Sequence, residues 1–237
     1  MLNNVVYESF ERPSRELVMA FADIPVANIT DEMNRMGCMD AGLRPLNKRK
    51  LLGVAVTVKA APNDNLMFHK AINIAQTGDV IVVDGKGSLT HALCGEFMYR
   101  TALSYGVEGF IVDGAVRDID ALERLDFSVY ARGVQPNGPY KNGPGAVNVP
   151  VSVGGLVVEP GDIIVGDQDG IVVINPNDAP ALAKRALAKF QAEQASLSQP
   201  VIPRPPYRDP NRYWVSRPFG MQNMLDASGA EVLKRRD

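Results

Sequence analysis

The sequence predicts an α/β fold in a single domain, with a helix and an extended proline-rich arm at its C-terminal end. Three observations indicate this. Short apolar, β-branched runs alternate with helical stretches in the middle of the chain, which is typical of parallel strands joined by crossover helices. Dense short strands separated by Gly and Pro follow Asp118. The last part combines an Ala-, Lys- and Gln-rich helix with a segment too rich in proline to continue it.

The elements of the first half follow from these patterns. Residues 1–50 predict helices and turns, with Thr30 as the N-cap of a helix whose first turn holds Asp31 and Glu32. Gly106 predicts the end of the second crossover helix. The predicted strands are Leu51–Val58, Asp79–Val83 and Gly109–Val112, and the predicted helices are Leu66–Ala75, Gly95–Tyr105 and Ile119–Leu125.

The second half predicts a β-rich half that packs against the α/β half. Asp167–Gly170 is expected to be a hairpin turn that ends in Asp-Gly. The domain is predicted to span residues 1–176, followed by a C-terminal helix at 177–198 and the proline-rich arm at 199–237. The predicted strands are Ser128–Ala131, Val147–Val153, Leu156–Val158, Ile163–Val165 and Gly170–Ile174.

Composition narrows the class of protein. Hydrophobic residues make up 46% of the 237 residues, and the net charge of −2 predicts no nucleic-acid partner. No apolar run is long enough to span a bilayer, and the N-terminus lacks a secretory signal, so we expect a cytoplasmic protein without membrane contact. Cys38 and Cys94 are expected to be reduced and buried. Two histidines cannot form a three-His zinc site within one subunit, which favours a hard, oxygen-bound metal.

The first candidate site is the start of the helix at Gly95-Glu96-Phe97-Met98. The free amides and the dipole of a helix N-terminus suit a carboxylate or a phosphate. Gly95 lets a ligand approach the backbone closely. Glu96 has a purely structural alternative, because an acid in the first turn stabilises a helix by itself.

The second candidate site is the turn that leaves the strand ending near Val112, with the sequence Asp113-Gly114-Ala115-Val116-Arg117-Asp118. Arg117 can hold a carboxylate bidentately, and Asp118 can hold a divalent cation together with water and substrate oxygens. The alternative is that Asp118 only caps the next helix and Arg117 is its surface partner. The two candidate sites lie on adjacent crossover units, which favours the functional interpretation.

Taken together, these segments resemble the RraA-like family, which joins 4-hydroxy-4-methyl-2-oxoglutarate aldolases with the regulator of ribonuclease E activity. The resemblance runs from about Phe21 to Ile174, and the order and spacing of the matching stretches make it specific. Those stretches are Gly53–Val58, Pro62–Leu66, Gly78–Asp84, Gly95–Glu96, Gly106–Gly109, Val112–Asp118, Phe127–Gly133, Asn148–Val151, Pro160–Asp162 and Asp167–Val173.

The resemblance implies a compact α/β/β/α sandwich that assembles into homotrimers or homohexamers, with sites between subunits. It implies that Arg117 binds the carboxylate of a pyruvyl group, that Asp118 anchors Mg²⁺ or Mn²⁺, and that the amides of Gly95–Met98 share the carboxylate. Glu96 would act through a bound water. The resemblance implies that the regulator branch of the family lacks this metal-binding Asp, so the presence of Asp118 favours the enzyme branch. The proline-rich arm departs from the aldolases, and Glu193, Asp209 and Asp226 are alternatives for an acid that assists a neighbouring subunit's site.

The expected activity is a metal-dependent carbon–carbon lyase reaction, the class II aldolase cleavage of a 4-hydroxy-2-oxo acid to pyruvate and a second oxo acid. Expected substrates include 4-hydroxy-4-methyl-2-oxoglutarate and 4-carboxy-4-hydroxy-2-oxoadipate. Oxaloacetate decarboxylation passes through the same enolate and is an expected companion activity. Two alternatives remain open: a non-catalytic protein that binds ribonuclease E, and a different lyase of 2-oxo acids or sugar acids on the same scaffold.

Overall fold

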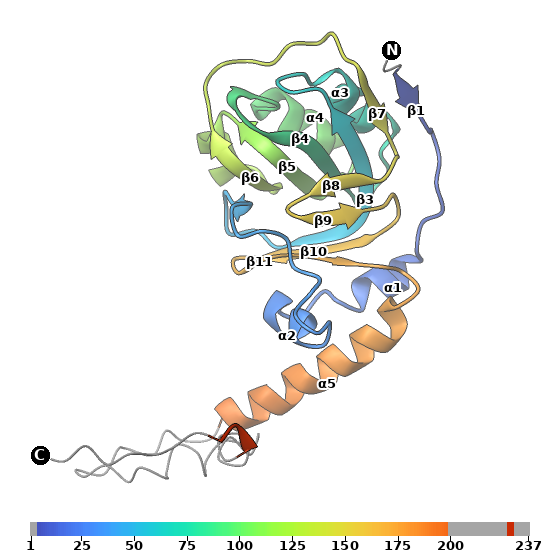
Figure 1. Ribbon diagram of the computed structural model, residues 1–237, viewed down its shortest axis with the longest axis vertical. Coiled ribbons are helices and arrows are strands. Elements are labelled where there is room, and N and C mark those ends of the chain that lie inside the picture. Colours follow the sequence, from blue (N-terminus) through green and yellow to red (C-terminus); the bar gives the residue numbers. More distant parts are fainter. Residues whose placement is uncertain (1–3, 199–226, 230–237) are drawn as a thin grey trace, which may run out of the picture. The chain divides into compact units, whose positions relative to one another are not determined.

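The structure is a computed structural model that describes residues 4–198 and 227–229 (Figure 1). The chain divides between Ala195 and Ser196 into two units, and the fold described below belongs to the first. Apart from residues 227–229, the predicted proline-rich arm lies outside the described residues, as do Asp209 and Asp226.

Four parallel strands form the centre of a nine-stranded sheet, and they pair in the order of the chain. Each is an apolar, β-branched run that is buried along most of its length, as the sequence predicts. Helical connections join them, so the predicted parallel crossover units are confirmed. The strands are β3 (Leu51–Ala60), β4 (Asp79–Ala92), β5 (Gly109–Val116) and β6 (Ser128–Val134); the connections are α3 (Leu66–Ile74), α4 (Glu96–Ser104) and the 3-10 helix η1 (Ile119–Glu123).

Strand β3 belongs to two parts of the sheet. Its first residues, Leu51–Val54, pair antiparallel with β10 (Ile163–Asp167), and its later residues, Val54–Lys59, pair parallel with β4. Gly53 sits at this change of partner, where a Cβ would overlap the carbonyl oxygen of Gly78 and lie 2.9 Å from Val80 Cγ2. Only a glycine lets β3 approach the start of β4 this closely. One strand therefore joins both parts of the sheet.

The layers follow the order helix, sheet, sheet, helix (Figure 1). Helices α3 and α4 cover one face of the parallel strands through a core that includes Phe68 and Phe110. A second core lies between the opposite face and the hairpin β8–β9, and a third lies between β10–β11 and helices α1, α2 and α5. The predicted α/β/β/α arrangement is confirmed. The bounds are β8 Val151–Val153, β9 Leu156–Val158, β11 Gly170–Ile174, α1 Arg15–Met19, α2 Val26–Asp31 and α5 Ala179–Leu197; the short edge strands are β1 Val5–Val6, β2 Arg44–Pro45 and β7 Gly145–Val147.

Some predicted elements were wrong in their bounds. The helix predicted to start at Thr30 instead begins at Val26, because the carboxylate of Asp167, distant in sequence, accepts the Val26 amide at 2.9 Å. Thr30 lies near the end of that helix, where its hydroxyl donates to the Val26 carbonyl. The strand predicted at Val147–Val153 is two strands, since Asn148 adopts a left-handed φ of 57° between β7 and β8.

The second half is rich in strands, as predicted, but only its hairpin β8–β9 forms a separate sheet that packs against the first half. Strands β6 and β7 pair with the parallel strands, and β10 joins them through β3, so these strands complete the large sheet. Gln168 and Asp169 form the predicted hairpin turn between β10 and β11, where Asp167 pairs with Gly170. Cys38 is exposed, contrary to expectation, whereas Cys94 is buried.

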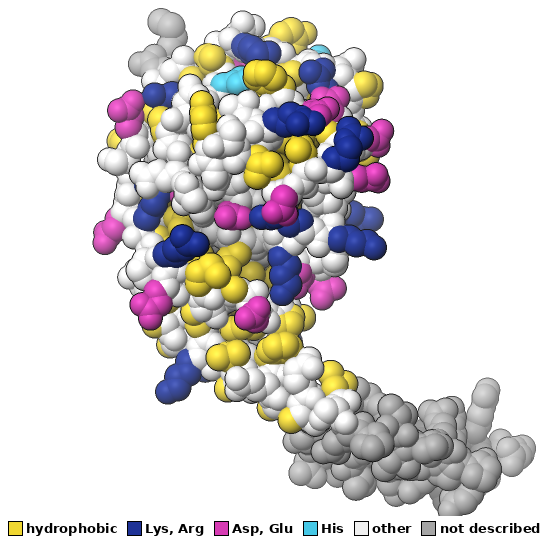
Figure 2. Space-filling model, turned by 180° about the vertical axis from the view of Figure 1, so that it is seen from behind, with side chains coloured by type: hydrophobic (Ala, Val, Ile, Leu, Met, Phe, Trp, Pro, Cys, Tyr) yellow, Lys and Arg dark blue, Asp and Glu magenta, His cyan; other side chains and the backbone are white. Residues whose placement is uncertain are grey.

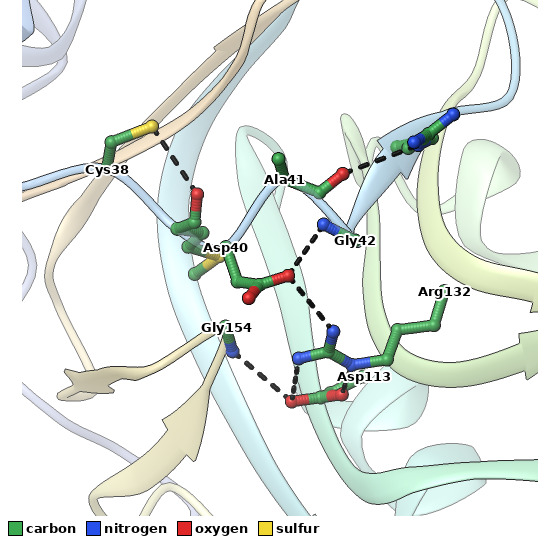
Figure 3. A network of polar contacts seen from close by, with 9 residues as sticks. Cys38, Asp40, Ala41, Gly42, Asp113, Arg132 and Gly154 are labelled. Atoms are coloured by element: carbon green, nitrogen blue, oxygen red, sulfur yellow. Dashed lines mark hydrogen bonds and ion pairs between the residues drawn. The ribbon is translucent and has the colours of Figure 1, made fainter.

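An ionic network fastens the layer of β8–β9 to the ends of β5 and β6 (Figure 3). The Arg132 guanidinium donates to Asp113 through Nε and Nη2, and through Nη1 to Asp40 Oδ1 at 3.2 Å. The Gly154 amide donates to Asp113 Oδ2 at 3.2 Å, and the Gly42 amide donates to Asp40 Oδ1 at 2.6 Å. The network therefore connects the hairpin, two strands and the loop that holds Asp40.

Charges of both signs are intermingled on the face shown in Figure 2. In the part of the chain that the structure describes, no helix is long and apolar enough to cross a membrane.

We predict that Asp40 stabilises the fold only above acidic pH. The Gly42 amide, and then Arg132, hold the pKa of Asp40 below the ordinary value of 3.8. Because the folded pKa is the lower one, the stabilisation is present above the unfolded pKa and disappears as pH falls through the folded pKa. We expect Asp40→Asn to lower Tm at pH 7, and we expect this Tm difference from the wild type to shrink as the pH falls toward 3, measured by thermal unfolding across that range.

The control is Asp23→Asn, which makes the same charge change at an exposed position. A Tm difference for Asp40→Asn that stays constant from pH 7 to pH 3 contradicts the prediction.

Candidate functional site

The two predicted site segments lie side by side at the carboxyl end of β5. The loop between β4 and α4 runs along that strand: the Leu93 amide donates to the Ala115 carbonyl at 2.8 Å, and the Arg117 amide donates to the Cys94 carbonyl at 3.0 Å. Strand β5 extends to Val116, so the predicted turn shrinks to Arg117 and Asp118. The start of α4 is therefore held against the Arg117-Asp118 turn by backbone hydrogen bonds.

Gly95 is the closest point between the segments. A Cβ at this position would overlap Asp118 Oδ2 and would lie 2.9 Å from Arg117 Cγ and 3.2 Å from Arg117 Nε. Its φ of −159° is ordinary extended backbone, so the glycine is required for space alone. The absence of a side chain at residue 95 lets both charged groups reach the start of α4.

Asp118 caps a helix, but not the one expected. It precedes η1 with a left-handed φ of 57° and makes no side-chain hydrogen bond to that helix. Its Oδ2 instead accepts the amide of Glu96, the first residue of α4, at 3.1 Å. Arg117 Nε lies 3.6 Å from the same oxygen. The alternative in which Asp118 only caps the helix that follows it was wrong, while the predicted contact between Arg117 and Asp118 is present.

Four amides at the start of α4 were predicted to hold a carboxylate together. The Glu96 amide is engaged by Asp118, and the Met98 amide donates to the Gly95 carbonyl at 2.9 Å. Within the described ranges, the amides of Gly95 and Phe97 donate to no protein group. Two donors, not four, are thus available to an anion, because the turn and the helix use the other two.

The side chains of these residues differ in their surroundings. Arg100 binds Glu96 Oε1 through Nε at 2.8 Å and Nη2 at 2.7 Å, one helical turn along α4, as the structural alternative for Glu96 allows. The Phe97 ring is 80% exposed, whereas Met98 is buried with its sulfur facing Asn65 Nδ2. Only the backbone of Met98 faces the site.

Arg117 is positioned by a residue that sequence reasoning missed. The buried Tyr99 donates its hydroxyl to the Arg117 carbonyl at 2.8 Å. Burial raises the pKa of both Tyr99 and Cys94 above their ordinary values, so both remain protonated at neutral pH. The aromatic residue at the fourth position of the helix gave no signal of this role, because it also fits the apolar face of α4.

A second missed feature is the loop after β6. The Gln135 amide donates to the Val116 carbonyl at 2.9 Å, and the Ala92 amide donates to the Asn137 carbonyl at 2.8 Å. Gly138 lies so close to Arg117 that a Cβ there would be 3.2 Å from Nη1. The run Pro136-Asn137-Gly138-Pro139 signalled a turn, but only the fold shows that the turn lines the Arg117 side chain.

This geometry suits an oxygen-bound divalent cation. Asp118 is 46% exposed and uses one carboxylate oxygen for the Glu96 amide, so the other oxygen is free to bind a metal. Over residues 4–198 and 227–229, no group of three or more His, Cys, Asp or Glu side chains could hold a metal. Coordination by one protein carboxylate and several water or substrate oxygens is typical of Mg²⁺.

Comparison with known proteins identifies relatives of this chain. Residues 26–173 match the model of the RraA-like family, described as Aldolase/RraA. A protein of Halalkalibacterium halodurans named "Putative 4-hydroxy-4-methyl-2-oxoglutarate aldolase" is 38% identical over 191 residues, which cover 79% of this chain and 91% of that protein.

Two solved structures share the fold. Streptomyces coelicolor RraAS2, described as an unusual member of the RNase ES inhibitor RraA family, is 27% identical with a TM-score of 0.71, covering 81% of this chain and 100% of that chain. The RNA-processing inhibitor RraA of Thermus thermophilis is 30% identical with a TM-score of 0.59, covering 64% and 93%.

We predict that Tyr99→Phe loosens the Arg117-Asp118 turn. The variant keeps the ring but leaves the Arg117 carbonyl without its donor, which costs about 1 kcal/mol of unfolding free energy. We expect a lower midpoint in urea and faster hydrogen exchange of the Arg117 amide, measured by NMR.

Tyr105→Phe is the matched control, since Tyr105 is half exposed and its hydroxyl makes no hydrogen bond within the described part of the chain. If the Arg117 amide exchanges at the same rate in Tyr99→Phe as in the wild type, the hydroxyl does not hold the turn.

Proposed function

Because the chain belongs to the RraA-like family, we propose that it is a class II pyruvate aldolase that depends on Mg²⁺ or Mn²⁺. The substrate is a 4-hydroxy-2-oxo acid such as 4-hydroxy-4-methyl-2-oxoglutarate or 4-carboxy-4-hydroxy-2-oxoadipate, cleaved to pyruvate and a second oxo acid. The single observation that carries the proposal is the close approach at Gly95, which brings together the Arg117 guanidinium, a free carboxylate oxygen of Asp118 and the free amides of Gly95 and Phe97.

Each residue has a role in holding the pyruvyl end of the substrate. The guanidinium of Arg117 is 43% exposed, and its ion-pair contact among the described residues is with Asp118 at 3.6 Å, so it can bind the substrate carboxylate. The amides of Gly95 and Phe97 donate to the same carboxylate at the positive end of α4. Asp118 would hold the cation, which when bound would supply Lewis-acid polarisation of the substrate's keto oxygen.

Glu96 is the proposed route for the proton. One of its oxygens is held by Arg100, and the other is free to orient a water molecule. That water removes the proton of the distal hydroxyl as the carbon–carbon bond breaks, and later returns a proton to the methylene carbon. The pairing with Arg100 fixes the orientation of the Glu96 carboxylate.

Several parts of the proposal concern the wider function. Oxaloacetate decarboxylation is proposed as a side activity, since it needs the same pyruvyl site. The protein is proposed to be a cytoplasmic homotrimer or homohexamer whose sites lie between subunits. An acid from a neighbouring subunit would complete the site; Glu193 accepts a hydrogen bond from Asn28 Nδ2 at 2.6 Å, which makes it a weaker candidate for that role.

We predict that purified protein exchanges the methyl protons of pyruvate with deuterium when Mg²⁺ is present. Exchange reports enolate formation without the true substrate, and it is followed by loss of the methyl signal in proton NMR. Asp118→Asn is expected to slow the exchange by about 100-fold or more, because a charged group at the reacting oxygens is lost. Asp120→Asn, an exposed acid two residues further on, is expected to keep the wild-type rate.

Exchange that is independent of Mg²⁺, or unchanged in Asp118→Asn, would falsify the metal-dependent reaction.

A second candidate function is non-catalytic binding to ribonuclease E, and it is supported by the structures described as RNA-processing and RNase ES inhibitors. It predicts no exchange in any variant and a stable complex with ribonuclease E, measured by analytical ultracentrifugation of the two purified proteins.

A further inference from the structure

A row of charged side chains crosses the four parallel strands, on the face opposite α3 and α4. Lys59 on β3 pairs in register with Asp84 on β4. Asp84, Asp113 and Arg132 each follow directly after the aligned residues Val83, Val112 and Ala131. Because side chains alternate along a strand, these residues share the face of Val82, Ile111 and Tyr130, which form the core beneath β8–β9.

The two ends of this row differ. At one end, Asp113 and Arg132 bind each other; Arg132 also binds Asp40, and Asp113 also accepts the Gly154 amide (Figure 3). At the other end, residues of β3 and β4 line an open cavity of about 290 Å³ together with Pro150 and residues of the hairpin β8–β9. Its lining residues are Lys59, Asp84, Lys86, Pro150, Val151, Ser152 and Val157.

The charges around this cavity are unequal. Asp84 is buried, and its carboxylate accepts both the Lys86 amide at 3.2 Å and the Lys86 ammonium at 2.5 Å. The ammonium of Lys59 forms no ion pair or hydrogen bond with any residue in the described ranges. With two lysines and one neutralised carboxylate, the cavity carries an excess of one positive charge.

We propose that this cavity binds a small organic monocarboxylate, separately from the Arg117 site. Lys59 donates to the carboxylate through its ammonium group. Pro150, Val151 and Val157 provide an apolar wall for a short hydrocarbon chain, and the volume is at the small end of ligand sites. The buried carboxylate of Asp84 disfavours a dianion such as phosphate.

The test uses butyrate and the full-length chain, with saturation-transfer NMR titrations in physiological chloride. All measurements start from Arg117→Ala, so that carboxylate binding at the Arg117 site does not contribute. We expect this protein to bind butyrate saturably, and we expect adding Lys59→Met to raise the Kd by about tenfold or more, since a hydrogen bond to a charged group contributes at least that much.

Lys184→Met in the same background is the matched control, because Lys184 is an exposed lysine on α5. It should leave the Kd unchanged. The proposal is overturned if Arg117→Ala shows no saturable binding, or if Lys59→Met and Lys184→Met give the same Kd. Since neither the metal nor the aldol reaction enters this measurement, its outcome is independent of the proposed function.

Discussion

The double pairing of β3 is the constraint on which the rest of the fold depends. The strand is paired antiparallel to β10 at one end and parallel to β4 at the other, so both layers of the sheet share it. Its side chains supply two cores, with Val56 and Val58 facing α3 and Ala55 facing the β8–β9 layer. Gly53 makes the exchange of partners possible by leaving room for the carbonyl of Gly78. A single strand thereby fixes how the helices, the sheet and the hairpin stack.

The candidate active site depends on this stacking, because the pairing of the parallel strands places the carboxyl end of β5 beside the loop that precedes α4. Strand β5 ends where the loop before α4 passes, and backbone hydrogen bonds from Leu93 and Arg117 join the two. The side chain of Asp118 then caps α4 from outside, and Tyr99 holds the Arg117 carbonyl from within the core. The charged groups are thus presented by elements that are themselves buried and hydrogen-bonded, which limits the reorganisation needed when a ligand binds.

The same strand ends present different chemistry on their two faces. Toward α4 lie Arg117 and Asp118, both more than two-fifths exposed and loosely paired at 3.6 Å. Toward β8–β9 lie Asp113 and Asp84, two buried carboxylates that are each held by a neighbouring cation. Asp113 lies on β5, whereas Arg117 and Asp118 lie in the turn beyond Val116, so this part of the fold holds both an open candidate site and a largely closed ionic network.

The sequence by itself determined the class of fold, the parallel strands with their crossovers, and the pair of segments that form the candidate site. Those features depend on local periodicity and on turn residues such as Gly106 and Asp169-Gly170, which act within a few residues. It missed whatever depends on partners far along the chain. Asp167 decides where α2 begins, Asp118 caps α4 instead of η1, and Tyr99 and Gly138 flank Arg117. Only the tertiary structure decided these, because a partner 18 to 141 residues away in the sequence leaves no trace in the local pattern of residues, yet it positions a backbone group as well as a neighbour does.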